Sequence, residues 1–131
     1  MNFHKHLVFT GVSPYPPRDP NYIKDCMLNI VHEADMEVFM PPQAKYCDDP
    51  TNAGVTGTVV ITTSHSSVHI WDNGLVQADL YSCKDFDVDH IAEVFKKLFL
   101  CEDYDMKVFD RRPSPRLQFF LDAIARETVA A

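Results

Sequence analysis

Glycine is scarce in this sequence, and several motifs that depend on it are missing. Only four glycines occur among 131 residues, and they do not form a glycine-rich loop that could bind phosphate. The G-x-S-x-G motif of serine hydrolases is also absent. No apolar run approaches the roughly 20 residues that span a bilayer, and the opening MNFHKHLVFT has no long apolar segment typical of a secretion signal. The sequence therefore predicts a cytoplasmic protein without a membrane partner.

Positive charge is scarce as well, with 12 lysines and arginines against 19 aspartates and glutamates. The formal net charge of -7 argues against nucleic acid as the main partner. No two of the four cysteines form a C-x-x-C motif, so we expect reduced thiols rather than a disulfide or metal site. His65 and His69 have the spacing of a zinc-binding helix, but they lie in a β-rich stretch, so we predict no metal.

Hydrophobic and turn-forming residues divide the chain into strands and helices. Their spacing predicts strands at residues 4–12, 36–47, 55–71, 75–83 and 104–110, and helices at 20–34, 87–100 and after Pro115. A length of 131 residues fits one domain, 1–131, in which 113–131 add an extra C-terminal helix. A hairpin at the centre of the pattern favours an α+β fold, an antiparallel sheet with helices packed on one face.

The central hairpin carries the strongest local signal in the chain, Asn73-Gly74 between two β-rich runs. An Asn-Gly pair in this context predicts a two-residue type I′ turn. With that turn, Ser64 lies directly opposite Cys83, on the same face and with Cβ atoms about 5 Å apart. A single bulge would shift this register.

His69 lies five residues from Ser64 in the same predicted strand. An odd separation places the two side chains on opposite faces, and five residues cover roughly 16 Å. If both residues serve one reaction, either the strand breaks or the site lies between two copies of the chain. The alternative is that residues 63–67 are an ordinary polar strand end and His69 a hydrogen-bonded structural histidine.

Four segments form a recognisable series: residues 54–61 (GVTGTVVI), Ser64-His65, His69-Ile70-Trp71, and residues 79–83 (DLYSC). In order and spacing they resemble the G-V-S-G-hydrophobic, E-S-H, H-x-W and D-hydrophobic-aromatic-x-C motifs of the small prokaryotic S-adenosylmethionine decarboxylases. These are pyruvoyl-dependent proenzymes that process themselves. The resemblance covers roughly residues 4–110, and it is the combination of motifs, more than any one of them, that is specific.

The resemblance implies a role for each matching residue. Cleavage between Thr63 and Ser64 would convert Ser64 into the pyruvoyl cofactor. His69 matches the histidine that assists this cleavage, and Thr56 stands where the family has a processing serine. Cys83 matches the cysteine that protonates the product. The family forms homodimers, αββα sandwiches with the site between protomers, which agrees with the separation of Ser64 from His69.

The expected substrate is S-adenosylmethionine, whose decarboxylation supplies aminopropyl groups for spermidine synthesis. The pyruvoyl ketone would form a Schiff base with the substrate amine and withdraw the electrons released as carbon dioxide leaves. A thiol opposite the ketone can then donate a proton. Trp71 and Asp72 are the expected substrate-binding residues, with Asp72 in place of the carboxylate that holds the ribose hydroxyls.

Several positions depart from the family pattern. Thr63 stands where glutamate is common, Thr56 replaces serine, and Thr10 lies near where relatives have an acidic residue. The phenylalanine expected to stack on adenine is missing, and Tyr46 is a weak substitute. These departures leave two alternatives open: a pyruvoyl-dependent decarboxylase of another amino acid, such as ornithine or arginine, and a homologue that neither cleaves itself nor catalyses.

Overall fold

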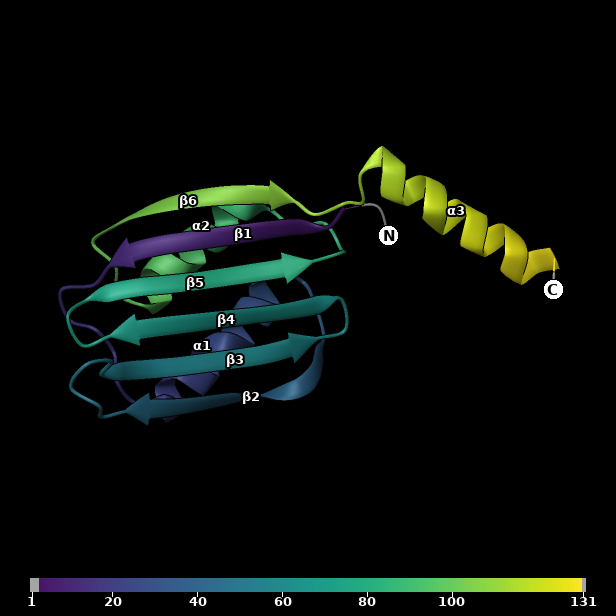
Figure 1. The fold of residues 1–131 in the computed structure, drawn as a ribbon. Helices are drawn as coiled ribbons and strands as arrows, with labels where there is room; N and C mark the ends of the chain where they lie inside the picture. The colour runs from purple at the N-terminus through teal and green to yellow at the C-terminus, as the bar shows by residue number, and fades with distance from the viewer. Residues whose placement is uncertain (1–2, 131) are drawn as a thin grey trace.

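Alternating buried and exposed side chains define six strands in the computed structural model, which describes residues 3–130 (Figure 1). The strands are β1 (Lys5–Val12), β2 (Val38–Cys47), β3 (Gly54–Ile61), β4 (Ser64–Trp71), β5 (Leu75–Ser82) and β6 (Asp103–Asp110). They form one antiparallel sheet in the order β2-β3-β4-β5-β1-β6. This arrangement confirms the predicted α+β class.

Two helices, α1 (Pro20–Glu33) and α2 (Val88–Leu98), lie together behind the sheet in Figure 1 and cover one of its faces. Each begins at an aspartate whose side chain accepts a backbone N–H, because the first turn of a helix leaves such donors unpaired. Asp19 accepts from Asn21 at 2.9 Å, and Asp87 accepts from His90 at 3.1 Å. The helix predicted at residues 87–100 is therefore confirmed, with Asp87 as its N-cap.

The core lies between these helices and the sheet. Phe9, Phe95 and Phe99 are fully buried there, and the rings of Phe9 and Phe95 meet edge to face with centroids 5.4 Å apart. Burial of each such ring contributes roughly 1.5–3 kcal/mol. The two glycines of the GVTG segment also serve packing, because a Cβ on Gly57 would lie 2.4 Å from Ile23 of α1.

The opposite face of the sheet, which we call the open face, has no helix over it among the described residues. Along each strand, residues alternate between the helix-covered face and the open face. The central strands β1, β3, β4 and β5 present to the open face His6, Val8, Thr10, Val12, Thr56, Thr58, Val60, His65, Ser67, His69, Trp71, Leu75, Gln77, Asp79 and Tyr81.

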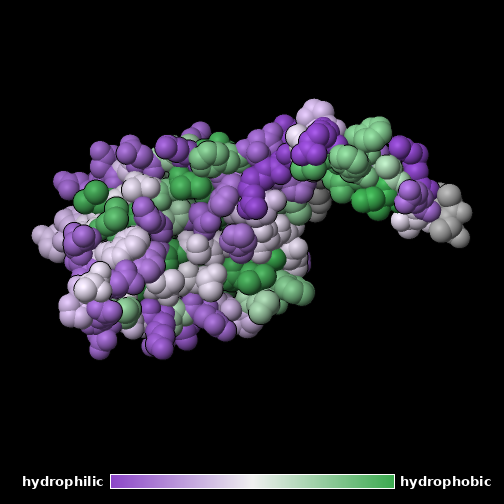
Figure 2. All heavy atoms as spheres, viewed as in Figure 1, coloured by the Kyte–Doolittle hydropathy of each residue, from purple (hydrophilic) through white to green (hydrophobic). Residues whose placement is uncertain are grey.

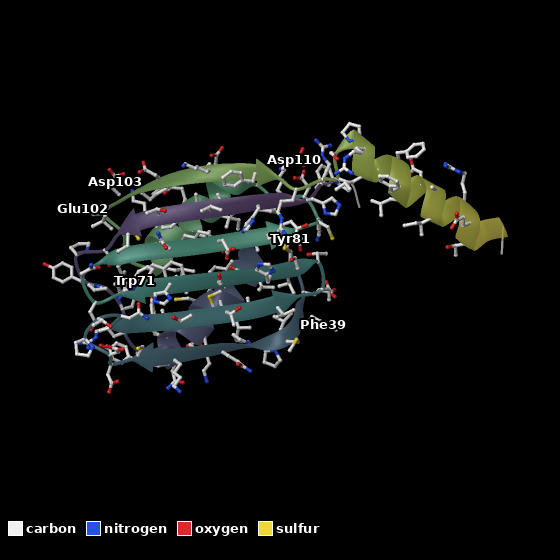
Figure 3. All side chains as sticks on the ribbon, in the orientation of Figure 1. Phe39, Trp71, Tyr81, Glu102, Asp103 and Asp110 are labelled. Carbon is white, nitrogen blue, oxygen red and sulfur yellow. The ribbon has the colours of Figure 1, made fainter. Side chains whose placement is uncertain are left out.

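The antiparallel register gives the sheet two chemically different ends. Ser64 and Ser82 lie at one end, which we call the Ser64 end. Trp71 and Leu75 lie at the other, which we call the Trp71 end. Trp71 and Tyr81 mark these opposite ends in Figure 3. Seven steps of about 3.3 Å separate Ser64 from Trp71 along β4, so the two ends are roughly 23 Å apart.

The prediction of one continuous strand over residues 55–71 is wrong, because a tight turn at Thr62 and Thr63 divides it into β3 and β4. Ile61 and Ser64 face each other as the last pair of this hairpin. The turn contains no glycine, proline or asparagine, so nothing in its composition signals it. It is anchored by the N–H of Thr62, which donates to the carbonyl of Glu37 at 3.1 Å.

The predicted register of the second hairpin is also wrong, by one residue. The loop has three residues instead of two, because the N–H of Gly74 donates to the carbonyl of Trp71 and Gly74 takes a φ of +100°. This is the conformation of a turn followed by a glycine bulge, the alternative to a type I′ turn. As a result, Ser64 pairs with Ser82, and Cys83 lies one residue beyond the strand.

The third helix, α3 (Pro115–Ala130), confirms the predicted C-terminal helix and projects away from the sheet (Figures 1 and 2). Its apolar side chains have helical spacing but remain exposed: Leu117, Phe119, Phe120, Leu121 and Ile124. Phe119 is 64% exposed. No described helix is long and apolar enough to cross a membrane.

Candidate active site

The peptide bond between Thr63 and Ser64 lies at the tip of the β3–β4 hairpin, and a backbone hydrogen bond holds its carbonyl. The N–H of Cys83 donates to the carbonyl oxygen of Thr63 at 3.1 Å. The hydroxyl of Ser82 donates to the hydroxyl of Thr63 at 2.8 Å. A backbone N–H aimed at a carbonyl oxygen stabilises negative charge that develops on that oxygen during attack.

The hydroxyl of Ser64 contacts the imidazole of the next residue, His65, with 3.1 Å between Oγ and Nδ1. The imidazole of His65 lies on the open face, edge-on to the rings of Tyr81 and His6 at centroid distances of 5.8 and 6.3 Å. The nucleophile predicted from the sequence therefore has a proton acceptor in its own chain. Sequence reasoning considered His65 only as a metal ligand and missed this contact, although the Ser64-His65 dipeptide was visible.

Asp79 organises the polar side chains of this part of the open face. One carboxylate oxygen accepts from His6 Nε2 at 2.7 Å and lies 4.0 Å from His65 Nε2. The other oxygen accepts from the backbone N–H of Ser67 at 3.0 Å and from its hydroxyl at 2.6 Å. Asp79 was visible in the DLYSC motif, but its partners became apparent only from the pairing of β1, β4 and β5.

At the Trp71 end, His69 and Thr56 face each other across β3 and β4, with 2.9 Å between Nδ1 and the threonine hydroxyl. The ring of His69 packs against Trp71, with centroids 4.0 Å apart. Burial lowers the pKa of His69, so the imidazole is neutral near pH 7. Its Nε2 atom is buried and has no hydrogen-bond partner among the described residues. An orphaned buried nitrogen of this kind indicates a missing partner.

A shallow cavity of about 380 Å³ lies beside His69 on the open face. Its polar lining comes from four strands and includes His6, Thr10, Thr56, Ser67, His69, Gln77 and Asp79. The cavity therefore links the network around Asp79 to the histidine at the Trp71 end. No group of three histidine, cysteine, aspartate or glutamate side chains among the described residues could hold a metal ion.

Asp72 lies just beyond Trp71 and is already engaged by two side chains. It accepts a hydrogen bond from the hydroxyl of Tyr46 and pairs with Arg18 at 3.1 Å. The guanidinium of Arg18 also lies over the ring of Tyr46, 4.9 Å from the centroid. The indole of Trp71 donates to the side chain of Asn52 at 2.9 Å. The structure thus brings Tyr46 and Asp72 together, and it adds Arg18, which sequence reasoning did not predict.

Cys83 differs from Cys26 and Cys101 in how deeply it is buried. Cys26 and Cys101 are buried, and burial raises the pKa of each thiol to about 11, which suppresses the reactive thiolate. Cys47 is exposed at the end of the edge strand β2. Cys83 is half-buried, and its backbone N–H holds the Thr63 carbonyl.

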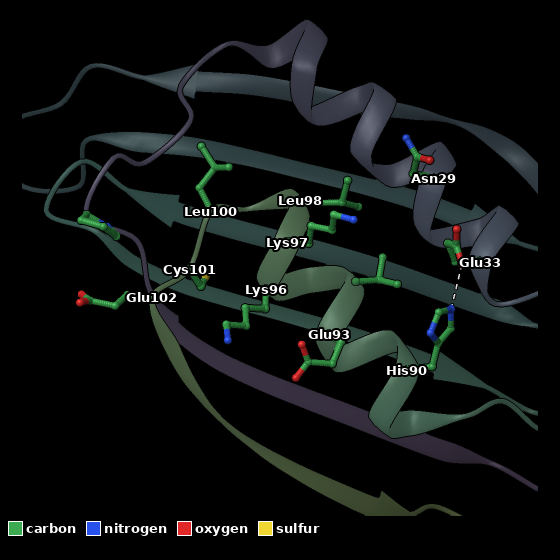
Figure 4. A pocket seen from close by; sticks show the side chains of 12 residues that line it. Asn29, Glu33, His90, Glu93, Lys96, Lys97, Leu98, Leu100, Cys101 and Glu102 are labelled. Atoms are coloured by element: carbon green, nitrogen blue, oxygen red, sulfur yellow. Dashed lines mark hydrogen bonds and ion pairs between the residues drawn. The ribbon is translucent and has the colours of Figure 1, made fainter.

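A larger cavity, of about 810 Å³, lies on the helix-covered side between α1 and α2 (Figure 4). The ion pair between His90 and Glu33, 2.8 Å long, closes one end of it. Its remaining charged groups have both signs: Glu93, Glu102, Lys96 and Lys97. None of the side chains predicted to be catalytic lines this cavity.

Comparison with known proteins establishes the family of the chain. A family model described as S-adenosylmethionine decarboxylase matches residues 5–112. The chain belongs to the S-adenosylmethionine decarboxylase family. A relative from Pyrococcus furiosus, "S-adenosylmethionine decarboxylase proenzyme", is 32% identical over 102 residues, 73% of this chain and 70% of the relative. A protein with the same description from Pyrococcus horikoshii is 33% identical over 100 residues, 71% of this chain and 69% of the relative.

A solved structure shares the fold of this decarboxylase-family chain. The crystal structure of the adenosylmethionine decarboxylase from Aquifex aeolicus superposes with a TM-score of 0.68 at 21% identity, covering 87% of this chain and 95% of that chain. The family resemblance inferred from the motifs is therefore confirmed, and the chain belongs to a family of carboxy-lyases. The family match ends at residue 112, before α3 begins.

Proposed function

We propose that this chain cleaves itself between Thr63 and Ser64 and then decarboxylates S-adenosylmethionine, supplying aminopropyl groups for spermidine synthesis. One observation carries the proposal: the Ser64 hydroxyl adjoins a carbonyl that the N–H of Cys83 already polarises. Relatives named as S-adenosylmethionine decarboxylase proenzymes support both the processing and the substrate.

The positions of these atoms suit the following steps of cleavage. The Ser64 oxygen attacks the carbonyl carbon of Thr63, and the N–H of Cys83 stabilises the resulting oxyanion. The carbon–nitrogen bond then breaks and leaves an ester. Removal of the Ser64 α-proton expels the Thr63 carboxylate. The remaining dehydroalanine tautomerises to an imine, and water converts this imine into the pyruvoyl ketone with release of ammonia. A serine at this position is required, because its β-oxygen is both nucleophile and leaving group.

The surroundings of Ser64 fit a pyruvoyl group. Ser64 is the first residue of β4, so cleavage would make it a new chain terminus at the end of a strand. Such a terminus does not require any strand pairing to break. The pyruvoyl ketone supplies an electron sink for decarboxylation. Cys83 lies next to this terminus, is only half-buried, and carries a thiol that could serve as the proton donor.

The open face supports a homodimer, because its central strands are depleted of charge. Among the open-face residues of β1, β3, β4 and β5, Asp79 alone is an aspartate, glutamate, lysine or arginine. Its carboxylate is satisfied by His6 and Ser67. Charged residues make up 24% of the chain, and depletion of charge is typical of an interface core. The flanking strands β2 and β6 present charged residues such as Lys45, Asp105 and Lys107, as expected of a rim.

A two-fold axis across the strands would complete the site. It would stack two open faces about 10 Å apart, the usual distance between packed sheets. The Ser64 end of each copy would then face the Trp71 end of the other, so His69 and Thr56 of one copy approach Ser64 and Cys83 of its partner. This arrangement also supplies a partner for the orphaned Nε2 atom of His69.

The direct test is denaturing mass spectrometry of the purified chain. Cleavage converts the 15.0 kDa chain into fragments of 63 and 68 residues (131 − 63 = 68), the second one blocked by pyruvoyl. Ser64→Ala should remain intact. Release of labelled carbon dioxide from carboxyl-labelled S-adenosylmethionine tests the second step. A wild-type chain that stays at 15.0 kDa after prolonged incubation would instead identify a homologue that does not process itself.

A second candidate substrate class is another amino acid, such as ornithine or arginine. The observation in its favour is the state of Asp72, whose carboxylate is already paired with Arg18 and Tyr46 and so is less free to hold ribose hydroxyls. Carbon dioxide release from ornithine or arginine, with none from S-adenosylmethionine, would select this alternative. In that case, turnover of S-adenosylmethionine should stay undetectable in Arg18→Ala. If the first proposal holds, Arg18→Ala should instead lower the KM for S-adenosylmethionine.

A further inference from the structure

His65 is the titratable side chain that contacts the Ser64 hydroxyl among the described residues. Its Nδ1 is 3.1 Å from the Ser64 oxygen, within hydrogen-bonding distance. On the other side of the ring, Nε2 is 4.0 Å from the Asp79 carboxylate. A neutral imidazole has one N–H and one lone pair. The negative charge of Asp79 favours the tautomer with hydrogen on Nε2, which leaves the Nδ1 lone pair directed at Ser64.

We infer that His65 is the general base of the first step of self-cleavage, with Asp79 as its positioning residue. This inference rests on the proposed self-cleavage and assigns a step of it that the family resemblance leaves without a residue. His65 Nδ1 takes the proton of the Ser64 hydroxyl as that oxygen forms its bond to the Thr63 carbonyl carbon. The same proton then passes from Nδ1 to the Ser64 nitrogen as the Thr63–Ser64 carbon–nitrogen bond breaks. The products are an ester and a free amine, and His65 is regenerated.

His69 cannot perform this step within one chain. It lies roughly 16 Å from Ser64 along β4, and its Nδ1 is engaged by Thr56. The two histidines therefore divide the reaction. His65 forms the ester in its own chain, and His69 of a partner copy removes the α-proton of that ester. A single copy should consequently stop at the ester stage.

Hydroxylamine distinguishes the two steps, because it cleaves esters rapidly at neutral pH and leaves peptide bonds intact. We would purify wild type, His69→Ala, His65→Gln and His65→Asn as full chains, incubate each with hydroxylamine, and measure masses under denaturing conditions. His69→Ala should be split at Ser64 by hydroxylamine. Both His65 variants should remain intact at 15.0 kDa, with self-cleavage at least 100-fold slower than wild type.

The two His65 variants separate the loss of a base from the loss of a contact. Asparagine keeps a hydrogen-bonding group near the Nδ1 position, and glutamine keeps one near Nε2, but neither amide accepts a proton near pH 7. The matched control is His90→Gln, because His90 is also a half-exposed histidine paired with a carboxylate, on the helix-covered side of the sheet. It should cleave at the wild-type rate, and circular dichroism checks that every variant is folded.

Each outcome bears on the inference separately from the proposed function. If wild type cleaves and either folded His65 variant cleaves within threefold of it, His65 is not the base, although the proposed function stands. If a His65 variant accumulates the hydroxylamine-sensitive ester as His69→Ala does, His65 acts after ester formation and the inference is overturned. If wild type stays uncleaved but is split by hydroxylamine, and the His65 variants resist hydroxylamine, the inference stands and the proposed self-processing fails. A wild-type chain resistant to hydroxylamine and uncleaved contradicts both.

Discussion

The Ser64 end and the Trp71 end of the sheet differ in chemistry, and the proposed self-cleavage needs both. The Ser64 end has the candidate nucleophile, the Thr63 carbonyl that accepts the N–H of Cys83, and Cys83 itself. The Trp71 end has a half-buried histidine, His69, whose pKa is lowered by burial and whose buried Nε2 atom has no partner among the described residues. Neither end has what the other supplies, and roughly 23 Å of β-strand separates them. In the proposed dimer, a small fold would build a large active site by using each end of one sheet once in each of two copies.

Electrostatics distinguish the two ends in the same way. At the Ser64 end, the Asp79 carboxylate accepts a hydrogen bond from His6 Nε2 at 2.7 Å and lies 4.0 Å from His65 Nε2. At the Trp71 end, burial alone acts on His69 and disfavours its charged form. His65 therefore lies beside a carboxylate, whereas His69 is a partly buried base without a charged partner among the described residues.

The largest effect should come from a charge at the centre of the open face. Val8→Lys places an ammonium in the proposed interface core, where it would be desolvated without a partner. We expect a folded monomer without self-cleavage, measured by light scattering and mass spectrometry. Lys107→Glu is the control, because Lys107 pairs with Val8 across β6 and lies on the proposed rim. A dimeric Val8→Lys that cleaves normally would exclude this interface.

The next largest effect concerns the Ser64 end alone. Cys83→Ala keeps the backbone N–H that holds the Thr63 carbonyl but removes the thiol. It should therefore cleave at close to the wild-type rate and decarboxylate about 100-fold more slowly. Cys47→Ala, at the exposed end of β2, serves as the control. Wild-type turnover by Cys83→Ala would remove the thiol from the mechanism.

A smaller effect concerns the stability of the Trp71 end. Burial lowers the pKa of His69 in the folded protein below the ordinary value of 6.5. As pH falls below 6.5, the unfolded chain binds a proton that the folded chain resists, so the free energy of unfolding decreases. His69→Gln should weaken this decrease between pH 6.5 and 5, as measured by urea denaturation. An unchanged pH dependence would show that the burial of His69 is not coupled to folding.

The smallest effect should come from the projecting helix. Removal of residues 113–131 deletes α3, whose apolar side chains are exposed in the single chain. The free energy of unfolding of the remaining body should change by less than about 0.5 kcal/mol. Thermal unfolding of the truncated and full-length chains provides the comparison, and a large loss of stability would indicate that α3 packs on the body.

The sequence predicted the elements of the fold well because hydrophobic spacing and capping residues act locally. The helix at Asp87 and the α+β order follow from such local patterns. The sequence-based prediction failed at both ends of β4, where a shift of one or two residues changes the strand boundary or the pairing register. The Thr62-Thr63 turn contains no typical turn residue, and a bulge at Gly74 shifted Ser64 from Cys83 to Ser82.

The candidate site was predicted in part. Motif spacing identified Ser64, His69 and Cys83, and the odd separation of the first two along one strand was enough to place their side chains on opposite faces. The sequence could not identify the partners of Asp79, because β1, β4 and β5 come together only through the pairing of distant strands. The sequence also could not predict that Arg18 forms an ion pair with Asp72, since the two residues are far apart in the chain.

Complementation between two inactive chains tests most directly the claim that the two ends work in pairs. Ser64→Ala and His69→Ala, with different tags, would be produced separately and together. Neither should cleave alone. In a mixed dimer, one site unites Ser64 of the His69→Ala chain with His69 of the Ser64→Ala chain, so about half of the His69→Ala chains should be cleaved when the chains mix freely. No cleavage in a confirmed mixed dimer would contradict the account.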